Sequence, residues 1–115
     1  MGKRQTILYD LRGTADSSGA CTLRSNRLRA GQLLCVQIVS VRQNDNNNVL
    51  VRVGIDRAGA FYEIVTLDLT KQGRTYSYSH TFWLESDCQL RLDFTGAGSG
   101  GICHAWLYGY LQDDG

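Results

Sequence analysis

The chain has 115 residues, with 12 basic and 11 acidic side chains and a formal net charge of +1. This length predicts one domain, residues 1–115, that buries a core without help from metals or disulfides. The balanced charge disfavours nucleic acid as a partner, because nucleic-acid binders usually carry a strong positive field. No apolar run is long enough to predict a membrane span, and the N-terminus has no cleavable signal pattern, so we expect synthesis in a cytoplasm without export.

Short extended segments alternate with turn-forming residues along the chain, and no stretch has the periodicity of an amphipathic helix. In chain order the predicted strands are residues 4–12, 21–28, 32–43, 49–57, 61–70, 75–84, 88–94 and 102–112. The asparagine-rich segment 44–48 and the glycine-rich segment 95–101 are typical of hairpin loops. About eight strands at this spacing predict an all-β fold, an antiparallel β-sandwich of the jelly-roll type.

The last predicted strand has two apolar faces, which alternate along the chain. One face carries small and aliphatic side chains that suit a core, namely Cys103, Ala105, Leu107, Gly109 and Leu111. The other face carries an aromatic band that consists of Ile102, His104, Trp106, Tyr108 and Tyr110. A second aromatic group, Tyr76, Tyr78 and Phe82, lies near this band if the two strands share a sheet.

Three interpretations of the band remain open. In the first, the aromatic side chains form the core of the sandwich. In the second they form a subunit interface, because Tyr, Trp and Arg are favoured where proteins bury surface against one another. In the third they stack on sugar rings. Ile102 favours a dry contact and ranks the interface above the sugar platform. The absence of proline, which leaves edge strands unprotected, also fits coverage by a neighbouring subunit.

The sequence offers little for metal binding or catalysis. Its two histidines, His80 and His104, lie in predicted strands, and the four cysteines show no Cys-x-x-Cys spacing, so zinc is disfavoured and no cofactor is expected. Cys103 and His104 are consecutive strand residues that point to opposite faces, which disfavours a cysteine nucleophile activated by this histidine. We expect the cysteines to be reduced and mostly buried, and the chain not to be an enzyme.

Four carboxylates, Asp56, Glu63, Asp68 and Asp93, lie on strand faces that also carry arginine. We therefore expect cross-strand charge pairs. A convergent histidine and carboxylate would instead favour a small hydrolase. Turn formation explains the oxygen-rich segments 44–48 and 85–87 without calcium.

The strand pattern and the run "YGYL" at 108–111 carry a resemblance to known proteins. The chain resembles small jelly-roll virion accessory proteins of tailed bacteriophages, which decorate capsids or build fibres and tail parts. It is similar, less closely, to the trimeric jelly-roll heads of the tumour-necrosis-factor and complement type, whose final strand has the same aromatic-Gly-aromatic-Leu character. In those trimers the aromatic face packs around the threefold axis, so the resemblance implies an interface role for Trp106, Tyr108 and Tyr110. The lack of a stalk segment and of a signal peptide favours the phage proteins.

The sequence thus predicts a non-enzymatic structural protein of a phage virion, made in the host cytoplasm. We expect a homo-oligomer, with a trimer favoured, that attaches to capsid or tail proteins as a decoration or accessory subunit. The candidate interface residues are Ile102, His104, Trp106, Tyr108, Tyr110, Tyr76 and Tyr78. The alternative is a carbohydrate-binding module in which Trp83, Trp106 and Tyr108 bind glycans.

Overall fold

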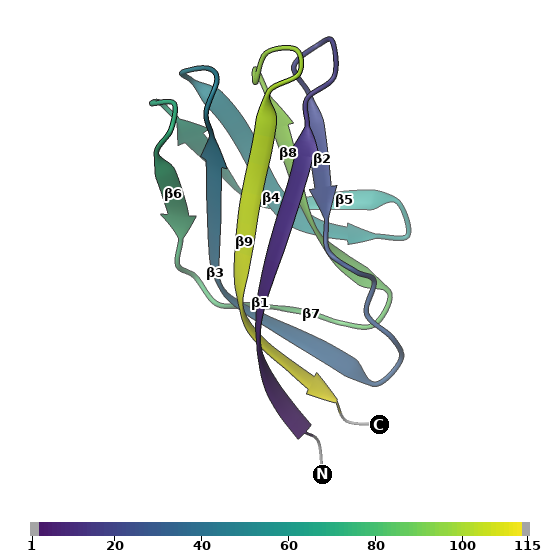
Figure 1. Cartoon of the computed structure of the whole chain (residues 1–115). Coiled ribbons are helices and arrows are strands. Elements are labelled where there is room, and N and C mark those ends of the chain that lie inside the picture. Colours follow the sequence, from purple (N-terminus) through teal and green to yellow (C-terminus); the bar gives the residue numbers. More distant parts are fainter. Residues whose placement is uncertain (1–2, 114–115) are drawn as a thin grey trace.

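The structure, a computed structural model, describes residues 3–113 and consists of strands joined by turns (Figure 1). The strands are β1 (Lys3–Thr14), β2 (Cys21–Arg24), β3 (Gln32–Gln43), β4 (Val49–Arg57), β5 (Ala60–Leu69), β6 (Thr75–Tyr78), β7 (Phe82–Leu84), β8 (Cys88–Thr95) and β9 (Ile102–Asp113). They form two antiparallel sheets. One has the order β1-β9-β3-β6, with β7 also paired to β3, and the other has the order β2-β8-β4-β5.

The pairing pattern confirms the predicted jelly roll. β1 pairs with β9, β2 with β8, β3 with β6, and β4 with β5, so the chain forms one long hairpin folded back on itself. This hairpin is rolled up, because β9 also pairs with β3 and β8 also pairs with β4. The roll places consecutive strands in opposite sheets everywhere except at the β4–β5 tip and between β6 and β7, which both pair with β3. An eight-stranded roll of this kind is the jelly-roll arrangement.

The tip of the long hairpin is a two-residue turn, because Arg57 pairs with Ala60. Both residues between them, Ala58 and Gly59, have positive φ, 53° and 85°. Positive φ at both central residues is the signature of a type I′ turn, whose twist matches that of the strands on either side. These residues lie between the two strands predicted at 49–57 and 61–70.

Two predicted strands differ from the structure. Residues 75–84 form two short strands, β6 and β7, so the structure has one more strand than we predicted over the described residues. The predicted strand 21–28 ends at Arg24. The Ser25 N–H still donates to the Leu90 carbonyl, but the Leu90 N–H donates to Ser25 Oγ at 2.9 Å, and the Ser25 carbonyl accepts from Gln89 Nε2 instead. Such side-chain bonds compete with a regular ladder.

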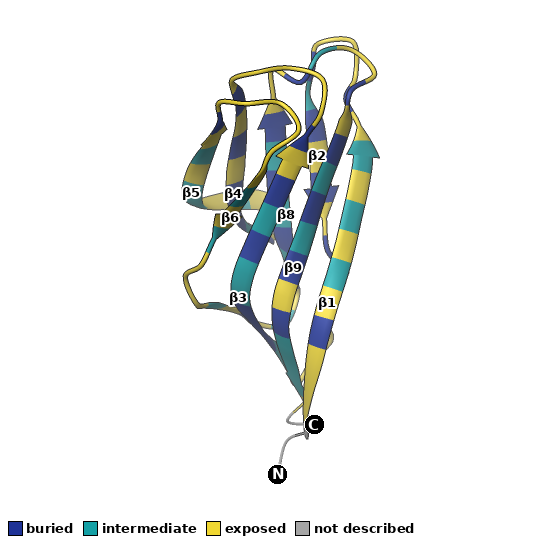
Figure 2. Cartoon of the chain, turned by 60° about the vertical axis from the view of Figure 1, so that its left-hand side comes forward, coloured by how far each residue is buried: buried dark blue, intermediate teal, exposed yellow. Residues whose placement is uncertain are grey.

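The core lies between the two sheets, and Figure 2 shows buried residues alternating with less buried ones along β3, β9 and β1. Val49, Val51 and Val53 of β4 are fully buried, as the alternation predicted. All four cysteines are buried and none is in a disulfide, in agreement with the sequence analysis. The described residues include no helix that is long and apolar enough to cross a membrane.

Candidate functional site

The two faces of β9 lie in different environments. Cys103, Ala105 and Leu107 are buried in the core, as predicted for the face with small side chains. Trp106 and Tyr108 point to the outer side of the five-stranded sheet, where Tyr108 is 44% exposed. The interpretation in which the aromatic band forms the sandwich core is therefore wrong, because the second sheet covers the other side of β9.

Neighbouring strands extend this band into a continuous surface, which we call the aromatic face. Cross-strand partners in a sheet point to the same side, and Tyr108 has Leu8 of β1 on one side and Ile38 of β3 on the other. The aromatic face consists of Leu8, Ile38, Trp83, Ile102, His104, Trp106, Tyr108 and Tyr110. Six large hydrophobic side chains are exposed among the described residues, and four of them belong to this face, namely Leu8, Trp83, Ile102 and Tyr108.

Side-chain contacts order the aromatic face. The Trp83 and Tyr110 rings meet edge to face with their centroids 5.5 Å apart. The His104 and Trp106 rings lie 4.0 Å apart, and His104 Nε2 contacts the carboxylate of Asp10 on β1. These contacts fix ring positions before any partner binds, which lowers the entropic cost of association.

A cation also stacks on this face. The Arg4 guanidinium lies 4.0 Å from the centroid of the Tyr110 ring. Cys35 of β3 lies opposite Tyr110 in the register. Cys35 is only 1% exposed, although it lies on the outer side of the sheet. Burial and a hydrogen bond with Cys35 raise the pKa of Tyr110, with the hydrogen bond the larger cause. Tyr110 thus packs over the Cys35 side chain as a neutral phenol.

The second predicted aromatic group does not join the aromatic face. β6 shares the sheet with β9, as expected, but Tyr76 pairs with Val41 and Tyr78 with Val39, and both valines are fully buried. The two tyrosines therefore point to the inner side of the sheet, opposite to Trp106. Placing Tyr76 and Tyr78 in one band with Trp106 is wrong, because the register puts Thr75 and Ser77 of β6 on the outer side instead. Tyr76 packs on the core edge and its hydroxyl lies 3.1 Å from Thr70 Oγ1.

The three candidate sugar-binding residues all lie on the aromatic face, although they come from two strands. Trp83 belongs to β7, and Trp106 and Tyr108 belong to β9. Trp83 and Tyr108 are each 44% exposed, whereas Trp106 is partly covered.

The outer side of the four-stranded sheet is different, because ion pairs cover it. Asp56, only 4% exposed, lies 3.4 Å from Arg24 and 3.2 Å from Arg91. Arg91 also pairs with Asp93, and Arg52 with Glu63. The predicted cross-strand charge pairs are confirmed for Asp56 and Glu63, whereas Asp93 pairs with Arg91 of its own strand.

These pairs shift the acidities of the carboxyl groups. Burial alone raises the pKa of Asp56, but hydrogen bonds from Arg24, from the Gly59 N–H and from Arg91 outweigh it and hold this pKa below its usual value. The hydrogen bond from Arg52, followed by one from Thr66, lowers the pKa of Glu63. This side of the molecule is thus charged, satisfied within the chain and suited to water.

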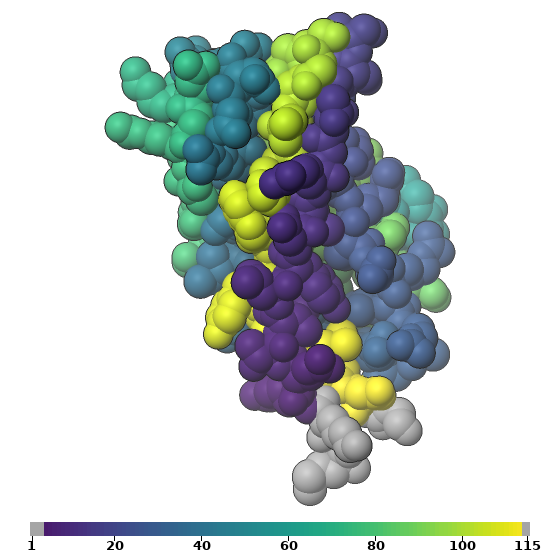
Figure 3. All heavy atoms as spheres, in the orientation of Figure 1, coloured from purple at the N-terminus to yellow at the C-terminus, as the bar shows by residue number. Residues whose placement is uncertain are grey.

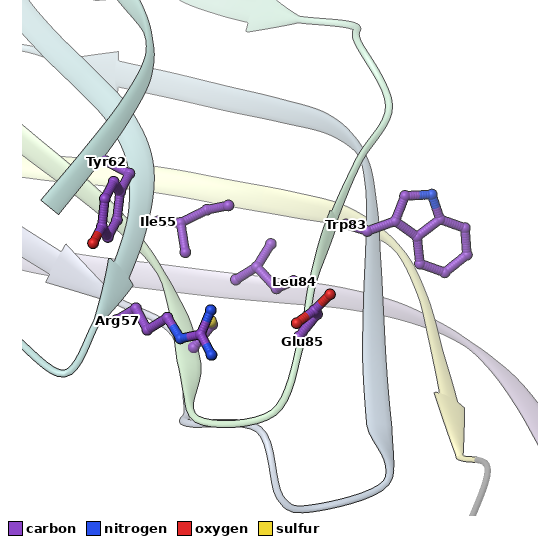
Figure 4. Close-up of a pocket in the computed structure, with 7 residues that line it drawn as sticks. Ile55, Arg57, Tyr62, Trp83, Leu84 and Glu85 are labelled. Atoms are coloured by element: carbon purple, nitrogen blue, oxygen red, sulfur yellow. The ribbon is translucent and has the colours of Figure 1, made fainter. Parts of the chain in front are cut away.

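A hollow of about 420 Å³ opens near the end of β4 and the start of β8 (Figure 4). It is lined by Ile55, Arg57, Tyr62, Trp83, Leu84, Glu85 and Cys88. Figure 4 shows the Trp83 ring turned away from the other lining residues, in accord with its contact with Tyr110. The hollow therefore does not bring the candidate site residues together.

The structure brings together one histidine and one carboxylate, His104 and Asp10. A hydrolytic site would also need a nucleophile within reach of that histidine. Among the hydrogen bonds of residues 3–113, none joins a serine, threonine or cysteine to His104. The same residues contain no group of three or more side chains that could hold a metal ion.

Sequence reasoning missed Leu8 and Ile38. The alternation in residues 4–12 places Leu8 with Thr6 and Asp10 and opposite Ile7 and Tyr9, and these polar companions mark its face as outward. Ile38 carries no such signal, because a bulge in β3 shifts the register between Val36 and Ile38.

Comparison with known proteins adds no evidence on function. No known protein family and no curated protein matches the sequence. Two solved structures of infectious bursal disease virus are similar: the Gx strain, with 10% identity over 97% of this chain and a TM-score of 0.44, and the Gt strain, with 13% identity over 96% and a TM-score of 0.43. The chain spans about a third of the length of these proteins, 31% and 32%. At such identities and scores, the likeness carries no functional argument.

Proposed function

We propose that the chain is a non-enzymatic structural subunit of a phage virion, and that it forms a homotrimer through the aromatic face. The observation that carries the proposal is the exposure of this face, whose centre is the row Leu8, Tyr108 and Ile38. A soluble protein rarely leaves a contiguous apolar surface of this kind uncovered without a binding role. Burying it between subunits removes the apolar surface from water.

The contrast between the two sheets supports the choice of surface. Ion pairs satisfy the outer side of the four-stranded sheet within the chain, so that side has little to gain from a partner. The aromatic face combines Trp and Tyr rings with arginine at its margin, which is the composition favoured at the centre of protein interfaces. A stable contact of ordinary size buries about 800 Å² on each partner.

Light scattering after size exclusion tests the oligomer. The wild type is expected at three times the chain mass of 12.8 kDa, or at a multiple of this trimer mass where trimers associate further. Tyr108→Ser is expected to lower the mass, because it places a hydroxyl in the dry centre of the contact. Tyr62→Ser is the matched control, since Tyr62 is 59% exposed but lies away from the aromatic face. A monomeric wild type, or equal masses for both variants, would show that the aromatic face is not the interface.

The virion location is supported by the resemblance in strand pattern and by the jelly-roll topology. Mass spectrometry of purified particles, produced by the virus whose genome encodes the chain, tests it. We expect the chain in intact particles at many copies. Its presence only in the soluble fraction of infected cells would contradict a structural role.

A carbohydrate-binding module is the second candidate, and the observation that favours it is the exposure of Trp83 and Tyr108 on one face. The perpendicular packing of Trp83 and Tyr110 leaves no flat platform of parallel rings, which ranks this function lower. A glycan array tests this candidate. Binding that Trp83→Ala abolishes would support the module, and a lack of binding to every glycan on the array would count against it.

A further inference from the structure

β1 is a long strand at the edge of its sheet. It runs from Lys3 to Thr14, pairs with β9 along one side, and no described strand pairs with its other side. Figure 3 shows β1, in purple, along the surface of the molecule with β9 in yellow beside it. Edge strands are usually blunted by proline, by a bulge, by shortness or by charged side chains. β1 lacks the first three, since its register with β9 is unbroken over its whole length, and its charges are of both signs.

The charges on β1 are arranged for self-pairing. Arg4 and Asp10 both lie on the outer side of the sheet, six positions apart, so about 20 Å of strand separates them within one chain. When two copies of β1 run antiparallel with Ile7 opposite Ile7, Arg4 of each copy lies opposite Asp10 of the other. Opposite charges that face each other across strands stabilise pairing.

Other registers are less favourable. Sliding the copies by one position on each strand, so that Leu8 faces Leu8, puts Arg4 opposite Arg12. Like charges directly opposite each other destabilise a sheet. The register centred on Ile7 also brings together two β-branched side chains at the margin of the two cores, where Ile7 is 7% exposed.

The neighbourhood of β1 leaves room for a partner. A hollow of about 290 Å³ lies between residues 8–11 of β1 and residues 24–26. The Asp10 side chain remains 64% exposed, and its contact with His104 uses Oδ1, which leaves Oδ2 for a second partner.

We propose that β1 pairs antiparallel with β1 of a second copy of this chain, about a twofold axis at Ile7, and so joins two five-stranded sheets into one. This contact rests on the proposed self-association and adds a second interface to it. The outer sides of both sheets then form one surface, and the two aromatic faces lie side by side.

A charge swap in the full chain tests the edge contact. Asp10→Arg replaces two attractions per twofold contact by two repulsions, and we expect association measured by sedimentation equilibrium to weaken about tenfold. Arg4→Asp should weaken it similarly. The double variant Arg4→Asp with Asp10→Arg should restore wild-type association, because each new Asp again faces a new Arg in the partner. The effect of the single variants should shrink at 1 M salt.

The double variant also controls for the loss of contacts within the chain. It loses both the Asp10 contact with His104 and the Arg4 contact with Tyr110, so these losses cannot explain a restored dimer. Thermal melting establishes that each variant is folded. Single variants without effect, or a double variant as weak as the singles, would overturn the edge contact.

The test of the edge contact and the test of the proposed function give distinguishable results. Tyr108→Ser removes the contact through the aromatic face and leaves the β1 edge intact, so we expect this variant to sediment at twice the chain mass. A monomeric Tyr108→Ser variant would overturn the edge contact while leaving the aromatic face supported. Loss of association in the charge variants, with no effect of Tyr108→Ser, would support the edge and contradict the face.

Discussion

Gly109 of β9 lies directly against the backbone of Cys35 in β3, so closely that a Cβ atom at position 109 would overlap the Cys35 carbonyl oxygen. The approach occurs beside the β3 bulge, where the register shifts between Val36 and Ile38. A bulge inserts an extra residue and bends its strand. The close approach of β3 therefore requires the glycine in "YGYL", and the tyrosines on either side of it belong to the aromatic face.

We expect Gly109→Ala to destabilise the chain by about 1–3 kcal/mol, because the added methyl group forces the two strands apart at the bulge. Urea denaturation measures the change. Thr6→Ala, an exposed change on the neighbouring strand β1, is the control and should cost about 0.5 kcal/mol or less. Equal midpoints for both variants would mean that β9 shifts to accept a side chain at this position.

Adjacent residues of β9 should respond differently to truncation. Leu107 is fully buried, so Leu107→Ala should lower the free energy of unfolding by about 2–5 kcal/mol. Trp106→Ala, on the aromatic face, should cost about 1–2 kcal/mol in the monomer and should lower the oligomer mass. Chemical denaturation and light scattering on both variants test this. A Trp106 variant with unchanged mass would argue against an interface at this ring.

Asp56 should make stability depend on acid. Its folded pKa lies below the ordinary value of 3.8, so the carboxylate stabilises the fold above that value and this contribution is lost as the pH falls through the folded pKa. Asp56→Asn should lower the Tm at pH 7 by several degrees and flatten the decline of Tm below about pH 4. The control is Asp68→Asn, an exposed change on β5. Parallel pH profiles of Tm for wild type and Asp56→Asn would show that the ion pairs of Asp56 with the two arginines do not contribute to the pH dependence of stability.

The Cys103 thiol should be inert in the folded protein. Burial, followed by the proximity of Cys21, raises the pKa of Cys103 to about 12. Because the thiolate is the reactive form, iodoacetamide at pH 8 should leave Cys103 unlabelled in native protein and label it in urea, as mass spectrometry would show. Since the folded pKa lies above the unfolded one, stability should also fall as the pH rises above about 9. Rapid native labelling would reveal local opening of β9.

Local signals in the sequence were enough to predict the strands and their alternation. The runs at 49–57 and 102–112 alternate with a period of two, which is a local property of an extended chain. These local signals predicted the all-β fold, the buried valines of β4 and the two faces of β9. They also predicted the cross-strand pairing of Asp56 and Glu63 with arginine.

Which face of each strand meets the core, and which residues lie beside one another, depends on how the two sheets pack. The side of β9 that faces outward depends on where the second sheet packs, so the aromatic band could not be assigned from alternation alone. The pairing of Tyr76 with Val41 turned that tyrosine away from Trp106, although both strands share a sheet. Register is set by contacts between segments far apart in the chain, and a shift of one residue exchanges the two faces of a strand.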